Sequence, residues 1–284
     1  MKSLYIPFKN YSTYVEIYES KKKSIPLIMC HGGPGSGRYG FIKLAKKLQK
    51  LGQTVILYDQ LGAGNSIPSD QPTSLYNIET WRDEFFNLVN YLKLDEYYTL
   101  GHSYGGMLLI KILVENNPKE MKKAILSSTL YSSKVWEDEA HRLIKFLSKN
   151  DQKVIKNAEE SNNYDSLEFQ KASKHYYKKF LKDDKKKPKD FKSGHVAYLT
   201  AWGPSEFKCL GNLQSFNYEG KLELIDKKCL ILSGGNDEST PYINKYMNDH
   251  IKNSKWVLFK DARHATYVDD ESNYIKALLD FLNN

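Results

Sequence analysis

The sequence predicts an α/β protein built on an open, mostly parallel sheet with helices on both faces. Short, almost continuously apolar runs, typical of strands covered on both sides, alternate with segments whose apolar residues recur every three to four positions. The alternation stops near residue 131 and resumes near residue 221. A chain of 284 residues with 40% apolar residues is long enough to bury one large core of this kind.

The first elements are recognised by apolar runs between turn residues. Residues 3–8 and 13–18 are expected to form an opening antiparallel pair of strands. The run at 25–30 is apolar at nearly every position, as in a parallel strand that is buried on both faces. A helix follows, because apolar residues from Phe41 to Leu48 share one face and Gly52 supplies a stop signal.

The same alternation defines the rest of the core. Each strand is followed by a helical pattern, so the strands should be parallel and their carboxyl ends should meet at one edge. We expect strands at 54–58, 97–100, 123–127, 229–232 and 256–259, and helices at 78–92, 104–116, 241–252 and 271–282. Residues 1–130 and 221–284 would form the core, and residues 131–220 a helical cap inserted over the strand ends.

The chain is basic, with 42 lysines and arginines against 34 aspartates and glutamates and a formal charge of +8. Such a balance favours nucleic acid or anionic membranes as partners. Much of the excess, however, lies in short lysine clusters at 21–23 and 185–187, and no nucleic-acid-binding motif accompanies them. We therefore expect solvated surface there, and neither a nucleic-acid nor a membrane partner.

The three cysteines, Cys30, Cys209 and Cys229, are too few and too scattered for a disulfide framework or a zinc site. Cys30 and Cys229 fall in apolar strands, so inert buried thiols are expected. Residues 1–14 lack the apolar segment of a signal peptide, and no run approaches the ~18 apolar residues of a membrane span. These features predict a cytoplasmic protein and leave its oligomeric state open.

The pentapeptide Gly101-His102-Ser103-Tyr104-Gly105 has the G-x-S-x-G spacing of a nucleophile elbow, a sharp turn between a strand and a helix. An apolar strand precedes it and an apolar helix follows it, as that turn requires. The two glycines let strand and helix approach closely around a strained serine. This context predicts the α/β-hydrolase fold, with Ser103 as the nucleophile.

A serine hydroxyl needs an adjacent base and a third group that orients the base. In this fold the acid and the base follow the serine in the order Asp or Glu, then His. Asp237 and His264 lie in the loops after the last two strands, whose ends would carry them to the elbow. Asp261 is a rival for orienting His264, but a neighbour in the same loop is less able to reach Nδ1. We expect Ser103, Asp237 and His264 to act together.

The loop His31-Gly32-Gly33-Pro34-Gly35 follows the third strand. A glycine-rich loop there directs a backbone N–H at a substrate oxygen, so the N–H groups of Gly33 and Tyr104 are the predicted oxyanion hole. The alternative is a plain turn, whereas a phosphate loop would need a Gly-Lys-Ser/Thr ending.

The histidines of the cap, His141, His175 and His195, are expected on the surface. Without a carboxylate at ligand spacing they indicate no metal site. The expected chemistry requires no cofactor.

Together these motifs resemble the prolyl iminopeptidases and related aminopeptidases, which are serine peptidases of the α/β-hydrolase fold. The resemblance covers nearly the whole chain. It rests on the two glycine-rich motifs above, with Gly106 extending the second, and on Asp59-Gln60-Leu61-Gly62-Ala63-Gly64-Asn65-Ser66. In this last motif Asp59 is expected to cap turns.

Two further segments resemble the family's substrate-binding residues. Trp202-Gly203-Pro204-Ser205-Glu206-Phe207 is similar to a cap segment whose glutamate holds the substrate's free α-amino group. Asp237-Glu238 is similar to the family's pairing of the aspartate with a second amine-binding glutamate. An ammonium that enters a partly dry pocket needs such negative charge. The resemblance therefore implies that Glu206 and Glu238 bind substrate, the alternative being ordinary surface ion pairs.

The resemblance implies a serine aminopeptidase that releases an N-terminal residue from short peptides with a free N-terminus, through an acyl-enzyme. Many family members carry Gly before the serine and Trp after it, where this chain has His102 and Tyr104. The released residue is therefore left open between proline and another, mostly apolar, residue. An esterase or lactonase acting on uncharged small substrates, and a binding protein without catalysis, are the alternatives.

Overall fold

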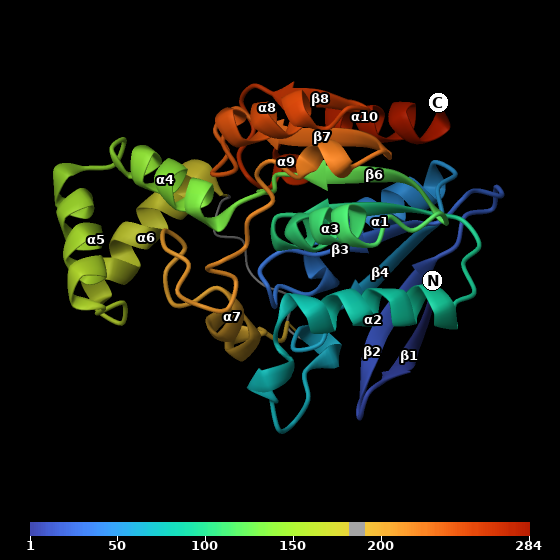
Figure 1. Cartoon of the computed structure of the whole chain (residues 1–284), viewed down its shortest axis with the longest axis horizontal. Coiled ribbons are helices and arrows are strands. Elements are labelled where there is room, and N and C mark those ends of the chain that lie inside the picture. The colour runs from blue at the N-terminus through green and yellow to red at the C-terminus, as the bar shows by residue number, and fades with distance from the viewer. Residues whose placement is uncertain (182–190) are drawn as a thin grey trace.

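The computed structural model describes residues 1–181 and 191–284, arranged around an eight-stranded sheet (Figure 1). The strand order is β1-β2-β4-β3-β5-β6-β7-β8. β2 runs antiparallel to β1 and β4, whereas β3 to β8 are parallel. The strands are β1 (Lys2–Phe8), β2 (Tyr11–Tyr18), β3 (Leu27–Cys30), β4 (Val55–Asp59), β5 (Tyr97–His102), β6 (Met121–Ser127), β7 (Lys228–Gly234) and β8 (Ser254–Phe259).

Helices cover both faces of this sheet, as the alternation of patterns predicted. The apolar stripes of α2, α3 and α8 pack on one face, and those of α1 and α10 pack on the other. These helices are α1 (Ile42–Lys50), α2 (Ile78–Tyr91), α3 (Tyr104–Glu115), α8 (Pro241–His250) and α10 (Glu271–Asn283). The predicted parallel sheet between two layers of helices is confirmed.

Between β6 and β7 the described chain is mainly helical. Its helices are α4 (Ser133–Ile144), α5 (Lys149–Ser161), α6 (Leu167–Phe180) and α7 (His195–Ala201). α4, α5 and α6 extend to one side of the sheet, on the left of Figure 1. They share an apolar cluster of their own, which includes Phe169, Tyr176 and Phe207. The predicted helical insertion is confirmed, while its limits at residues 131 and 220 stay a prediction.

The predicted elements differ from the structure mainly at their ends. β3 begins at Leu27, because Pro26 before it lacks the N–H that a ladder position requires. β5 continues to His102, two residues beyond the predicted end, so the strand runs directly into Ser103. The short helix α9 (Thr266–Asp269), which follows His264, was not predicted.

The lysine cluster at 21–23, the cap histidines and two of the cysteines lie where the sequence predicted them. Lys21, Lys22 and Lys23 are exposed, whereas the cluster at 185–187 lies outside the described residues. The three cap histidines are exposed, and the three cysteines are buried. Burial raises the pKa of the Cys30 and Cys229 thiols to about 12, so both stay protonated near neutral pH. Within the described residues, no helix is both long and apolar enough to cross a membrane.

Asp59, at the end of β4, caps two turns as predicted. One carboxylate oxygen accepts the backbone N–H of Arg38 and the other accepts that of Asn65, each at 2.8 Å. The Arg38 guanidinium also pairs with Asp59 and, at 2.8 Å, with Glu16 on β2. This buried ion-pair network fixes the loop after β3 against the antiparallel edge of the sheet.

A second buried carboxylate, Glu84 on α2, holds the loop that follows β4. It accepts the Leu61 N–H at 2.9 and 3.0 Å and the Thr13 hydroxyl. The indole N–H of Trp81 donates to the Leu61 carbonyl at 2.8 Å. Burial raises the pKa of Glu84 to about 8, although these hydrogen bonds oppose the shift.

Glu84→Gln should remove a pH-dependent loss of stability. The folded pKa of about 8 lies above the ordinary value of 4.5, so the folded state binds this proton more tightly. The stability it contributes is fully present below the unfolded pKa and is lost as the pH rises through the folded pKa. Between the unfolded and the folded pKa of Glu84, each pH unit lowers the free energy of unfolding of the wild type by up to about 1.4 kcal/mol.

The measurement is the free energy of unfolding in urea at about pH 5 and about pH 9. Relative to the wild type, the free energy of unfolding of Glu84→Gln should be higher at about pH 9 than at about pH 5. Glu79→Gln, an exposed change on the same helix, is the matched control. A difference that is the same at both pH values would contradict the assignment.

Candidate active site

β5 ends in a sharp turn centred on Ser103. The φ of this residue is 54° and its ψ is −124°, a conformation that L residues rarely adopt. The end of β6 holds the turn from both sides of the serine backbone. Ser103 N–H donates to the Ser127 carbonyl at 3.0 Å, and the Thr129 hydroxyl donates to the Ser103 carbonyl at 2.7 Å.

The glycines around Ser103 are required by the close approach of three backbones. A Cβ added at Gly101 would lie 2.3 Å from the Gly105 carbonyl oxygen, and one at Gly105 would lie 2.2 Å from the Cys30 carbonyl oxygen. A Cβ at Gly106 would meet the Thr129 hydroxyl at 2.3 Å. The G-x-S-x-G-G pattern therefore reflects the packing of β3, β5 and α3 around the serine.

The loops after β7 and β8 bring Asp237 and His264 together. Asp237 Oδ1 lies 2.8 Å from His264 Nδ1, and both side chains are buried. The carboxylate also accepts the N–H groups of Ser239 at 2.8 Å and Gly234 at 3.3 Å, which fixes its orientation. Asp261, the rival in the same loop, is exposed. The residue that faces Nδ1 is thus Asp237.

Ser103 and His264 line a cavity of about 650 Å³ that the carboxyl ends of the strands share with the cap. The glycine loop after β3 forms one wall and lies against the serine, since a Cβ added at Gly32 would be 2.9 Å from Ser103 Cβ. Tyr104 is the first residue of α3, so its N–H has no acceptor within the helix. Gly33 lines the same cavity and Tyr104 directly follows Ser103, and the role of their N–H groups as oxyanion donors stays a prediction.

Both glutamates that the family resemblance implied line this same cavity. Glu238 is buried, with Oε1 3.6 Å from His264 Nε2. Glu206 Oε2 accepts the Tyr198 hydroxyl at 2.7 Å. Burial raises the pKa of Glu206, and the Tyr198 hydrogen bond opposes that shift. The cavity therefore places two carboxyl groups beside the serine and the histidine.

Sequence reasoning missed Tyr198, which donates to Glu206 from α7. It is one of 21 tyrosines, and only its position four residues before the Trp202 segment would have singled it out. His102 also lines the cavity, and its ring centroid lies 4.8 Å from that of His264. His195 is exposed as expected, yet it too contributes to the cavity wall.

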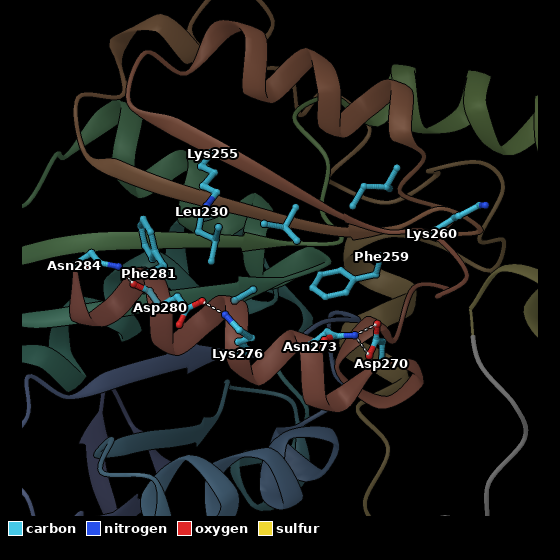
Figure 2. Close-up of a pocket in the computed structure, with 13 residues that line it drawn as sticks. Leu230, Lys255, Phe259, Lys260, Asp270, Asn273, Lys276, Asp280, Phe281 and Asn284 are labelled. Carbon is cyan, nitrogen blue, oxygen red and sulfur yellow. Dashed lines mark hydrogen bonds and ion pairs between the residues drawn. The ribbon is translucent and has the colours of Figure 1, made fainter.

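A second cavity, of about 560 Å³, lies between β8 and α10 (Figure 2). Its floor is apolar, with Leu230, Phe259 and Phe281, and charged pairs such as Lys276–Asp280, at 2.6 Å, form its rim. The described residues that line it include no serine, cysteine, threonine or histidine. Among the described residues that line it, there is thus no serine–histidine pair such as the one in the cavity at Ser103.

Comparison with known proteins agrees with this geometry. The family model described as the alpha/beta hydrolase fold matches residues 25–271. A proline iminopeptidase of Lactobacillus delbrueckii subsp. lactis is 42% identical over 284 residues, which cover 98% of this chain and 97% of the relative. The chain belongs to the proline iminopeptidase family.

Two other members support the assignment. A proline iminopeptidase of Clostridioides difficile (strain 630) is 40% identical over 98% of this chain and 97% of its own length. The crystal structure of a proline iminopeptidase from Mycobacterium smegmatis matches with a TM-score of 0.89 and 26% identity, over 99% of this chain and 98% of that one. The predicted family, the α/β-hydrolase fold and the serine-hydrolase class are confirmed.

Asp237→Asn should slow the reaction of Ser103 with a fluorophosphonate by about 10³-fold or more. The amide keeps the shape of the carboxylate but neither fixes the required tautomer of His264 nor stabilises its charged form. Intact-protein mass spectrometry follows the labelling. Asp261→Asn is the matched control and should react at the wild-type rate, whereas equal slowing of both variants would contradict the pairing of Asp237 with His264.

Proposed function

We propose that this enzyme is a serine aminopeptidase that releases proline from the N-terminus of short peptides. The observation that carries the proposal is the presence of two carboxylates, Glu206 and Glu238, in the cavity of Ser103 and His264. An ester or lactone has no cation for these groups to bind. Membership of the proline iminopeptidase family supports proline as the released residue.

In the proposed acylation step, Ser103 Oγ attacks the carbonyl carbon of the first residue and His264 takes its proton. Asp237 holds the Nδ1 side of the imidazole and stabilises the charged form. The backbone N–H groups of Gly33 and Tyr104 stabilise the oxyanion. His264 then protonates the leaving amine, and water releases the acyl group through the same residues.

The two glutamates account for attack at the first carbonyl only. An ammonium loses its hydration when it enters the cavity, and the cost is acceptable only beside negative charge. Glu206 and Glu238 supply that charge within reach of His264, so a free N-terminus is held one residue away from Ser103. An internal peptide segment carries no ammonium to hold there.

The number of donors favours proline in particular. The N-terminal ammonium of proline is secondary and has two N–H donors, one for each carboxylate. A primary ammonium has three and needs a further acceptor. The pair Glu206 and Glu238 therefore suits a secondary amine.

The proposed substrates are short peptides, because the helices inserted between β6 and β7 contribute walls to the cavity. The three cysteines are free thiols, which agrees with the cytoplasmic location that we propose. The mechanism draws on side chains and backbone groups of this chain alone.

Blocking the amine should abolish turnover. We expect kcat/KM for prolyl-aminomethylcoumarin to exceed that for the N-acetylated compound by about 10⁴-fold, because the blocked amine leaves both carboxylates without their partner. Initial rates of coumarin release give both constants. Equal rates would favour the esterase or lactonase alternative, and absence of fluorophosphonate labelling at Ser103 would favour the binding-protein alternative.

Variants of the glutamates complete this test. Glu206→Gln and Glu238→Gln should each lower kcat/KM for the free amine by about 10²-fold, the effect of removing one charged hydrogen-bond partner. Glu219→Gln, an exposed change between β6 and β7, is the matched control.

Tyr198→Phe should move the acid limb of the kcat/KM profile to higher pH. The Tyr198 hydroxyl stabilises the charged form of Glu206 and so opposes the upward pKa shift that burial causes. Without this hydroxyl the pKa of Glu206 rises further. As the pH falls, the carboxylate that binds the amine is then protonated at a higher pH. We expect a displacement of about one pH unit.

The pH–rate profile of prolyl-aminomethylcoumarin hydrolysis measures this displacement. Tyr242→Phe, an exposed change on α8, is the control and should leave the limb in place. An unchanged limb in Tyr198→Phe, or one that moves to lower pH, would contradict the role of the hydrogen bond.

A further inference from the structure

The loop that carries His264 is bonded to the cap through its backbone. His264 N–H donates to the Phe180 carbonyl at 2.9 Å, and Ala265 N–H donates to the Leu181 carbonyl at 3.1 Å. These carbonyls lie at the end of α6, where helix geometry leaves them without a partner in the helix. The backbone of the histidine is thus anchored on the inserted helices.

Arg263, the residue before His264, adds a side-chain bridge at the same place. Its Nη1 donates to the Lys178 carbonyl in the last turn of α6 at 3.0 Å. Its Nε and Nη2 donate to the two carboxylate oxygens of Asp269, both at 2.9 Å. The Arg263 backbone N–H donates to Asp269 at 2.9 Å as well. The guanidinium therefore joins α6 to α9, the short helix that follows His264.

We propose that Arg263 is a positioning residue of the reaction, which fixes the imidazole of His264 by locking its loop between α6 and α9. The proposal rests on the proposed role of His264 as the base. The planar fork of arginine makes two parallel bonds to a carboxylate while a third nitrogen reaches the helix end, a geometry that lysine cannot reproduce. The carbonyls of a helix C-terminus also favour a cation there.

The position of the bridge predicts which kinetic constant it controls. Arg263 is not among the described residues that line the cavity, and its bonds to Asp269 and Lys178 join two helices, so amine binding should persist without it. The imidazole, in contrast, would lose one of its anchors, and a displacement of about 1 Å costs on the order of 10²-fold in rate. Loss of Arg263 should therefore lower kcat and leave KM nearly unchanged.

The test compares Arg263→Ala and Arg263→Lys with Arg82→Ala. Arg82 on α2 donates from Nε and Nη2 to one carboxylate oxygen of Asp83, at 3.1 and 2.8 Å, and is similarly accessible, which makes it a matched control. Hydrolysis of prolyl-aminomethylcoumarin gives kcat per titrated active site and KM. The rate of fluorophosphonate labelling reports the activation of Ser103 without reference to a substrate.

We expect both Arg263 variants to lose about 10- to 100-fold in kcat and in labelling rate, with KM within about threefold of the wild type. Arg82→Ala should match the wild type. If Arg263→Ala does not fold, Arg263→Lys and Asp269→Asn provide the same readouts. Asp269→Asn keeps the contact between Arg263 and the Lys178 carbonyl, so its loss of kcat and labelling rate should be smaller.

Wild-type kcat and labelling rate in the Arg263 variants would overturn the inference, and so would full rescue by lysine. A loss confined to thermal stability, with unchanged kcat per active site, would overturn it as well. An enzyme that is labelled but does not cleave prolyl amides would contradict the proposed substrate. In that case a slower labelling of Arg263→Ala still supports the positioning role, and an unchanged one still overturns it.

Discussion

The close approach of β3, β5 and α3 around Ser103 is the constraint on which the rest of the site depends. Gly101 and Gly105 lie where a Cβ would meet backbone atoms at 2.3 Å or less, and the serine between them is held at positive φ. Such a conformation costs about 1–3 kcal/mol. Burial of a single aliphatic side chain contributes about 1.5–3 kcal/mol, and β5 and α3 bury several, including Leu100 and Leu108. The core can therefore hold the strained turn, and the parallel strands beside it deliver Asp237 and His264 to the same edge.

Charge is the second constraint, and it favours the proposed cationic substrate. Asp237, Glu238 and Glu206 gather around one histidine, and burial disfavours the charged form of Glu206. In the free enzyme the raised pKa of Glu206 reflects this cost. A substrate ammonium supplies the missing positive charge, so in the proposed mechanism binding stabilises the same carboxylates that select the substrate. An uncharged ester would not offset the cost of burying these carboxylates.

The sequence predicted the parts of the molecule that follow from local pattern. Apolar runs mark buried strands, and the glycines of the elbow mark a turn that no other residue fits, so the sheet, the succession of strands and helices along the chain and the sharp turn at Ser103 were all predicted. Several polar contacts other than the predicted Asp237–His264 pair were not. Glu84 contacts Thr13 from 71 positions away and Arg263 contacts Lys178 from 85, and periodicity reports which face is buried but not what it meets. Tyr198 is near Glu206 in sequence, but the loop between them decides whether the two meet.

The cap has a core of its own, and that core connects the proposed amine-binding residue with the loop of His264. Phe207, next to Glu206, is fully buried against Tyr176 and Phe169, at ring-centroid distances of 4.8 and 6.0 Å. Tyr176 belongs to α6, the helix whose end accepts the backbone N–H of His264. One small apolar cluster thus fixes Glu206, the proposed amine-binding residue, on one side and the loop of His264, the proposed base, on the other. In the proposed mechanism the separation between those two points sets the distance from the N-terminus to the attacked carbonyl, which makes the packing of the cap part of the specificity for a single residue.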